Sequence, residues 1–94
     1  MDTKKDSKIP QYGILQKIDK NKVIVGAKQL RKAIRAGRVN RVLLAKNADF
    51  ALTEALEATC LDHHIPVSWV PNMVELGRAC GIEVGAAAAA IVDQ

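Results

Sequence analysis

The sequence predicts an α/β protein, a three-layer α/β/α sandwich around a small mixed four-stranded sheet. Short apolar runs that are typical of strands recur along the chain, and segments with apolar residues at helical spacing lie between them. Short strands that alternate with helices of about ten residues form a sheet with helices on both faces. These two observations predict the fold class.

The chain is long enough for one hydrophobic core and too short for two. It has 94 residues, of which 49% are hydrophobic, and a chain of this size folds around a single core. Residues 1–9 are polar and charged up to Pro10. We therefore expect a flexible basic tail at residues 1–9 and a single α/β/α domain at residues 10–94.

The first half of the chain predicts two helices and two strands. Ile14, Leu15 and Ile18 repeat at helical spacing, and residues 22–25 form a strand-like run. Residues 26–36 then predict an amphipathic helix that ends at Gly37, and residues 42–45 predict a strand covered on both faces. The amphipathic helix has Ala27, Leu30, Ala33 and Ile34 on one face and Lys28, Arg31, Lys32 and Arg35 on the other.

The second half predicts two more helices and two more strands. Asp49 can cap a helix that ends near residues 62–64, and residues 65–70 predict a strand. Asn72, with Glu75 three positions later, resembles a capping box for a helix over residues 73–80. Residues 85–92 are ambiguous, because consecutive alanines favour a helix whereas Ile91 and Val92 after a glycine-bounded loop favour a strand. We predict a strand there.

The charges divide the chain into a basic half and an acidic half. Residues 1–46 hold 13 Lys and Arg against three acids, a net +10, and residues 47–94 hold one Arg against seven acids, a net −6. A strongly basic half within a chain of net charge +4 is the pattern expected of a protein that binds a phosphate backbone.

The junction at Gly26 is the strongest candidate for a binding site. A strand-like run meets a glycine, and the following helix opens with Lys28 and Gln29. Free backbone N–H groups at a helix start attract anions, and an amide with an ammonium group can contact base edges and phosphates. A solvated helix face is the alternative interpretation of the same basic stripe. Aromatic residues are scarce, which argues against proteins that stack unpaired bases on exposed rings.

The sequence offers no catalytic, metal or cofactor site. Cys60, His63 and His64 are of the residue types that bind zinc, but no fourth ligand lies at the spacing of a known zinc motif. We expect Cys60 and Cys80 to be reduced, buried thiols, the histidines to be surface residues, and Trp69 to be a core residue. No nucleophile elbow or phosphate-binding loop motif occurs, so we expect no enzyme and no cofactor.

The chain also lacks the sequence features of a secreted or membrane-spanning protein. Residues 1–8 have no apolar run of the kind found in signal peptides, and no stretch reaches the roughly 18 apolar residues of a membrane span. We therefore expect a soluble cytoplasmic protein without a membrane partner.

Three segments together resemble a known family. Residues 26–32 (GAKQLRK), 44–49 (LAKNAD) and 70–85 (VPNMVELGRACGIEVG) are similar, in this order and spacing, to the kink-turn RNA-binding ribosomal proteins of the L-seven-Ae and L-thirty-e group, and most of all to short bacterial ribosome-associated members. The resemblance covers about residues 22–92. It implies the same α/β/α sandwich and a noncatalytic protein that recognises and stabilises kink-turn RNA.

The resemblance also implies which residues contact RNA. The start of the helix at Gly26 would enter the major groove of a sharply bent RNA at its tandem G·A pairs, where Lys28 and Gln29 contact guanine edges and Lys32 holds phosphates. An apolar loop would pack against nucleotides flipped out of the bulge. The complete set of implied RNA-binding residues is Gly26, Lys28, Gln29, Arg31, Lys32, Arg35, Ile82, Glu83, Val84, Gly85 and Ala86.

The expected partner is therefore structured RNA, a kink-turn in ribosomal RNA or in the leader of a messenger RNA. The ribosome is a second expected partner, and we expect the protein to be a monomer. A protein-interaction adaptor on the same fold, without RNA specificity, is the alternative hypothesis, since one fold can serve several functions.

Overall fold

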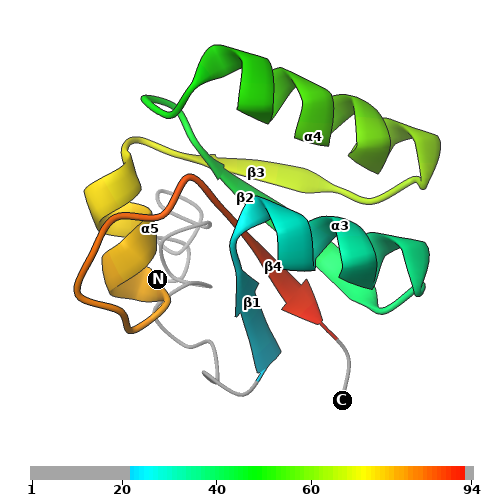
Figure 1. Cartoon of the computed structure of the whole chain (residues 1–94), viewed down its shortest axis with the longest axis horizontal. Coiled ribbons are helices and arrows are strands. Elements are labelled where there is room, and N and C mark those ends of the chain that lie inside the picture. The colour runs from blue at the N-terminus through cyan, green and yellow to red at the C-terminus, as the bar shows by residue number, and fades with distance from the viewer. Residues whose placement is uncertain (1–21, 93–94) are drawn as a thin grey trace, which may run out of the picture.

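The structure, a computed structural model, describes residues 22–92 and contains one mixed four-stranded sheet with helices on both faces (Figure 1). The predicted fold class is confirmed. The tail at residues 1–9 and the helix predicted near Ile14 lie outside the described residues. The elements in chain order are β1 (Val23–Val25), α3 (Ala27–Arg35), β2 (Val39–Ala45), α4 (Phe50–Asp62), β3 (Val67–Val70), α5 (Met73–Ala79) and β4 (Ala88–Val92).

The last strand of the chain, β4, lies inside the sheet. The strand order is β1-β4-β2-β3, with β4 antiparallel to both β1 and β2 and with β3 parallel to β2. Ala88, Ala89 and Ala90 are almost completely buried there. The strand predicted over residues 85–92 is confirmed but begins at Ala88. It forms because pairing with two neighbouring strands outweighs the intrinsic preference of alanine for helices.

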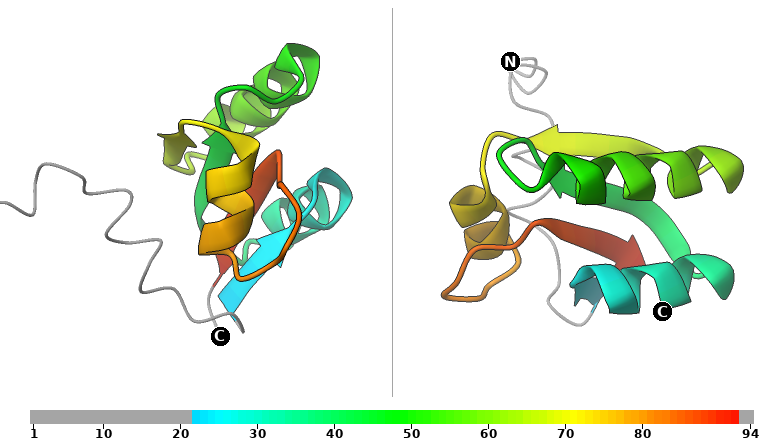
Figure 2. Two further views of the ribbon diagram at one scale, coloured as in Figure 1. Left: turned by 90° about the vertical axis from the view of Figure 1, so that its left-hand side faces the viewer. Right: turned by 45° about the horizontal axis from the view of Figure 1, so that its top comes forward.

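Helices cover the two faces of the sheet and enclose two clusters of buried side chains. On one face α3 and α4 lie side by side (Figure 2) and bury Leu30, Ile34, Leu56 and Cys60 against β2 and β4. On the other face α5 buries Leu76 and Cys80 against the same strands. The alternating side chains of β2 serve both clusters, as expected of a strand between two layers.

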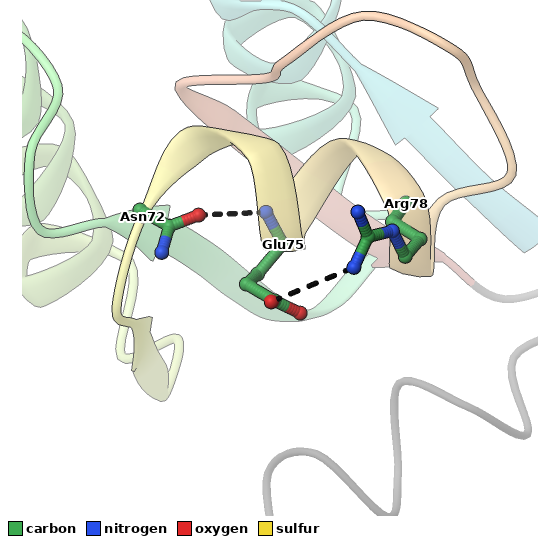
Figure 3. A network of polar contacts seen from close by, with 3 residues as sticks. All are labelled: Asn72, Glu75 and Arg78. Atoms are coloured by element: carbon green, nitrogen blue, oxygen red, sulfur yellow. Dashed lines mark hydrogen bonds and ion pairs between the residues drawn. The ribbon is translucent and has the colours of Figure 1, made fainter.

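Side chains cap two of the three described helices. The Asp49 carboxylate accepts a 2.9 Å hydrogen bond from the Ala51 N–H at the start of α4. At the start of α5 the Asn72 side chain accepts a 2.8 Å bond from the Glu75 N–H, while the Glu75 carboxylate lies 3.6 Å from the Arg78 guanidinium (Figure 3). Both predicted caps are confirmed, although the described bonds include one direction of the capping box and not its return bond.

Some boundaries and burial predictions differ from the structure. The strand predicted over residues 42–45 begins at Val39, and the one predicted over residues 65–70 begins at Val67. Trp69 packs against the cluster beneath α4 but is only half-buried, because β3 is at the edge of the described sheet. Both cysteines are free and buried, as predicted. No helix among residues 22–92 is long and apolar enough to span a membrane.

The topology brings three helix starts to one end of the sheet. Strands β1, β2 and β3 run in the same direction, since β1 and β2 are both antiparallel to β4 and β3 is parallel to β2. Their carboxyl ends, at Val25, Ala45 and Val70, therefore meet the amino end of β4 at Ala88, and each is followed by a helix. We call this the helix-start end. In open α/β sheets, ligands bind at such an end.

Candidate nucleic-acid interface

Backbone hydrogen bonds hold the start of α3 beside the loop that precedes β4. The Gly26 N–H donates to the Ala88 carbonyl at 3.2 Å, and the Ala45 N–H at the end of β2 donates to the Ala87 carbonyl at 3.0 Å. The last residue of the connection from α5 to β4, Ala87, and the first residue of β4, Ala88, are therefore fixed between the start of α3 and the end of β2. The helix start and the apolar loop, which the resemblance implies as two RNA contacts, lie at one end of the sheet.

A second pair of bonds ties the same loop to α5. The Asn47 side chain accepts a 2.8 Å bond from the Met73 N–H, and the Met73 carbonyl accepts a 3.0 Å bond from the Ala86 N–H. Asn47 thus connects the turn after β2 with the start of α5. Sequence reasoning missed this role, because asparagine is common in turns and the partner of Asn47 is distant in sequence.

The start of α3 is open to an anionic ligand. Gly26 occupies the N-cap position with φ 105°, and no side chain caps the first turn. A Cβ at Gly26 would meet nothing within 4 Å. Since α4 and α5 are capped by Asp49 and Asn72, α3 is the described helix whose first turn is uncapped by a side chain. Its N–H groups and the positive end of its dipole can therefore serve a bound anion.

The predicted contact residues of α3 point away from the core. Lys28, Gln29, Lys32 and Arg35 are exposed and Arg31 is half-buried. The opposite face of α3 is buried through Leu30, Ala33 and Ile34, which anchors the helix to the sheet. The helix therefore presents amide and cationic groups from a rigid support.

The loop before β4 presents one large apolar side chain. Val84 is 70% exposed, Glu83 and Gly85 are exposed, and Ile82 is half-buried against the cluster beneath α5. Ala86, implied as a contact residue, lies instead in that cluster with 5% exposure. Its side chain packs in the core because residue 86 lies just before β4, where the backbone bond from the Ala86 N–H to the Met73 carbonyl holds the chain against α5. Within the loop, Val84 is the side chain best placed for an apolar contact.

The close packing of this loop depends on a glycine in α5. A Cβ at Gly77 would collide with the Val84 carbonyl oxygen and would lie 3.0 Å from the carbonyl carbon and 3.1 Å from the Gly85 Cα. Because these are backbone atoms, the loop itself would have to move. Gly77 therefore sets the position of Val84.

Further exposed groups flank the same end. Phe50, the first residue of α4, is 74% exposed, and Val74, in the first turn of α5, is 59% exposed. Lys46, just after β2, is also exposed. The exposure of Phe50 could have been predicted from the sequence. Phe50 directly follows the capping residue Asp49, and this position lies outside the apolar repeat of the helix.

The described residues contain no grouping suited to metal binding or nucleophilic chemistry. Within residues 22–92, no three His, Cys, Asp or Glu side chains gather so that they could hold a metal ion, and His63 and His64 are exposed at the end of α4. Burial, with a smaller contribution from the nearby Glu57 charge, raises the pKa of the Cys60 thiol to about 11. Cys60 is therefore protonated and inert at neutral pH.

The mixed sheet, the uncapped basic helix start and the adjoining loop define a protein of the ribosomal L7Ae type. The chain matches the model of the "Ribosomal protein L7Ae/L30e/S12e/Gadd45 family" over residues 12–94, and it belongs to that family. The family resemblance inferred from the sequence is confirmed. The family is non-enzymatic, and the chain is not an enzyme.

Named relatives are bacterial proteins of similar length. The chain is 39% identical over 71 residues to RNA-binding protein YbxF of Geobacillus stearothermophilus, covering 76% of this chain and 87% of that one. It is 43% identical over 70 residues to an RNA-binding protein of Bacillus pumilus, covering 74% of this chain and 85% of that one.

A solved structure has a similar fold. The structure of the Giardia lamblia 15.5 kD RNA-binding protein matches with a TM-score of 0.74 and 27% identity, covering 79% of this chain and 62% of that longer one.

Proposed function

We propose that this chain is a noncatalytic RNA-binding protein that recognises and stabilises kink-turn RNA. The observation that carries the proposal is the hydrogen bond from Gly26, just before α3, to Ala88, the first residue of β4, which holds the α3 start beside the end of the loop that contains Val84. One surface offers cations and an amide, and the adjoining one offers Val84. The names of the relatives support RNA as the ligand.

The two surfaces suit a bent RNA better than a regular duplex. The major groove of A-form RNA is too deep and narrow for a helix, whereas a sharp bend opens it and exposes unpaired nucleotides. In this proposal Lys28 and Gln29 contact guanine edges at the tandem G·A pairs, and Lys32 contacts phosphates. Arg31 and Arg35 extend the positive field along α3, and Val84 packs against flipped-out nucleotides of the bulge.

The protein would act by population shift. An RNA that interconverts between open and bent forms is driven to the bent form by a ligand that binds that form more tightly. The positions of α3 and the loop are fixed by the protein core, so the binding surface itself does not need to be ordered by the RNA. We further propose that the protein is a cytoplasmic monomer whose RNA partner is ribosomal RNA or a messenger leader on or near the ribosome.

A titration of kink-turn RNA beside a straight duplex of equal length tests this proposal. We expect preferential binding of the kink-turn, measured by fluorescence anisotropy at two salt concentrations. Lys28→Ala and Gln29→Ala should each cost about 1–3 kcal/mol of specific binding free energy. Arg38→Ala is the matched control, because Arg38 is exposed beyond the opposite end of α3. Equal affinities of the wild-type protein for the two RNAs would refute the proposal.

A further inference from the structure

The outward face of α4 is apolar although no described element covers it (Figure 1). Its exposed side chains are five apolar residues and two acids, whereas the exposed side chains of the neighbouring α3 are all polar. Large apolar side chains that gather on an uncovered surface mark an interaction site, and Phe50 and Leu61 are the large exposed side chains of this kind on α4. The exposed residues of α4 are Phe50, Ala51, Glu54, Ala55, Ala58, Leu61 and Asp62.

The arrangement of this face suits a second helix. Phe50 and Leu61 are 74% and 72% exposed, and they lie on the same side of α4 because about three full turns separate them. Glu54 and Glu57 lie between them on that side of α4, and Ala58 lies beside this row, where its small side chain allows another helix to approach closely. The two large side chains would then bracket a partner helix of about three turns.

The charges on α4 specify a basic partner. Glu54 and Asp62 are exposed and Glu57 is half-buried, and α4 contains no Lys or Arg. Within residues 22–92 none of these carboxylates forms an ion pair. RNA is excluded from this face by its own negative charge, whereas a segment with lysines or arginines beside an apolar stripe would complement it.

The same charges argue against a second copy of this chain. If two copies of α4 packed antiparallel with Phe50 against Leu61 of the other copy, the register would bring Glu54 opposite Glu57 on both sides of the symmetry axis. Like charges placed together in an interface oppose association. This packing of two copies is therefore unfavourable.

We propose that the outward face of α4 is a docking surface for a basic amphipathic helix of another protein. This surface begins with Phe50 at the helix-start end and extends along α4 to Leu61, so RNA at the start of α3 leaves its distant part, at Ala58 and Leu61, open. The protein would then link a folded RNA to a protein neighbour. The proposal does not depend on RNA binding.

A defined peptide tests the proposal. The probe is a fluorescently labelled peptide of about 18 residues, five turns of helix, with leucines on one face and lysines beside them. A second peptide has glutamates in place of the lysines. We expect saturable binding of the lysine peptide to the full chain, and Ala58→Arg and Leu61→Asp should each weaken it at least about tenfold.

The matched control is Ala36→Arg. It makes the same change of residue and of net charge at the exposed end of α3, so it should leave peptide affinity within about twofold of wild type. Circular dichroism checks that each variant is folded. Equal weakening by Ala36→Arg and Ala58→Arg, equal binding of the two peptides, or no saturable binding would overturn the proposal. So would wild-type dimers in sedimentation that Ala58→Arg converts to monomers, because the occupant would then be a second copy.

Discussion

Replacing Gly77 by alanine tests the link between the core and the loop that presents Val84. The new methyl group would collide with backbone atoms of Val84 and Gly85. The loop cannot easily retreat, because the Ala86 N–H donates to the Met73 carbonyl at 3.0 Å and the Ala87 carbonyl accepts from Ala45 at 3.0 Å. The substitution therefore strains either the loop or α5.

Two opposing contributions set the magnitude. Overpacking a well-ordered interior costs about 1–3 kcal/mol, and a collision with tethered backbone belongs at the upper limit. Alanine in place of glycine inside a helix returns roughly 1 kcal/mol. We expect the free energy of unfolding to fall by about 2 kcal/mol, which lowers Tm by about 8–16 °C for a domain of this size.

Thermal and urea unfolding followed by circular dichroism measure this loss. Gly85→Ala is the matched control in the same loop, because its Cβ would lie 3.2 Å from the Met73 Cβ and 3.3 Å from the Met73 carbonyl carbon, contacts that a shift of a few tenths of an ångström relieves. It should change the free energy of unfolding by less than about 1 kcal/mol. If Gly77→Ala proved as stable as wild type, helix propensity would dominate and the described packing of the loop would be wrong.

Three further predictions concern the interface and the core. Lys32→Ala should weaken RNA binding and reduce the slope of log affinity against log salt by about one; an unchanged slope would place Lys32 outside the phosphate contacts. Asp49→Ala should lower the free energy of unfolding by about 0.5–2 kcal/mol in urea melts, because α4 loses its cap at Ala51; unaltered stability would contradict the capping role. The pKa of the Cys60 thiol rises from 9.0 to about 11 on folding. Cys60 therefore ionises at lower pH in the unfolded chain than in the folded one. The free energy of unfolding should fall as pH rises between these values, by at most about 1.4 kcal/mol per pH unit. Cys60→Ala should lack this part of the fall, and an identical pH profile would disprove the assignment.

Local patterns in the sequence predicted the elements of the fold well. The spacing of Leu30, Ala33 and Ile34 gave the buried face of α3, and the aspartate and asparagine before α4 and α5 gave two helix starts. These signals are local, because they depend on helix periodicity and on a side chain that reaches its own backbone. The exposed positions of Lys28, Lys32 and Arg35 followed from the same periodicity.

Features that depend on distant contacts could not be predicted in the same way. The polar residues Asn40 and Arg41 concealed the early start of β2, which pairs with β4 through a register shift between Val39 and Arg41. The tether from Asn47 to Met73 and the burial of Ala86 both depend on how the loop before β4 meets α5. Pairing register and loop docking arise from tertiary packing, which local propensity does not encode.

The central claim is that the start of α3 and the loop at Val84 together hold a bent RNA. The most direct measurement is energy transfer between a donor and an acceptor on the two arms of a kink-turn RNA, titrated with wild-type protein and with Gln29→Ala and Val84→Ala variants at low Mg²⁺. We predict that wild-type protein brings the arms together, and that each variant requires a higher concentration for the same change. Tight binding without a change in energy transfer, or equal bending by all three proteins, would contradict the account.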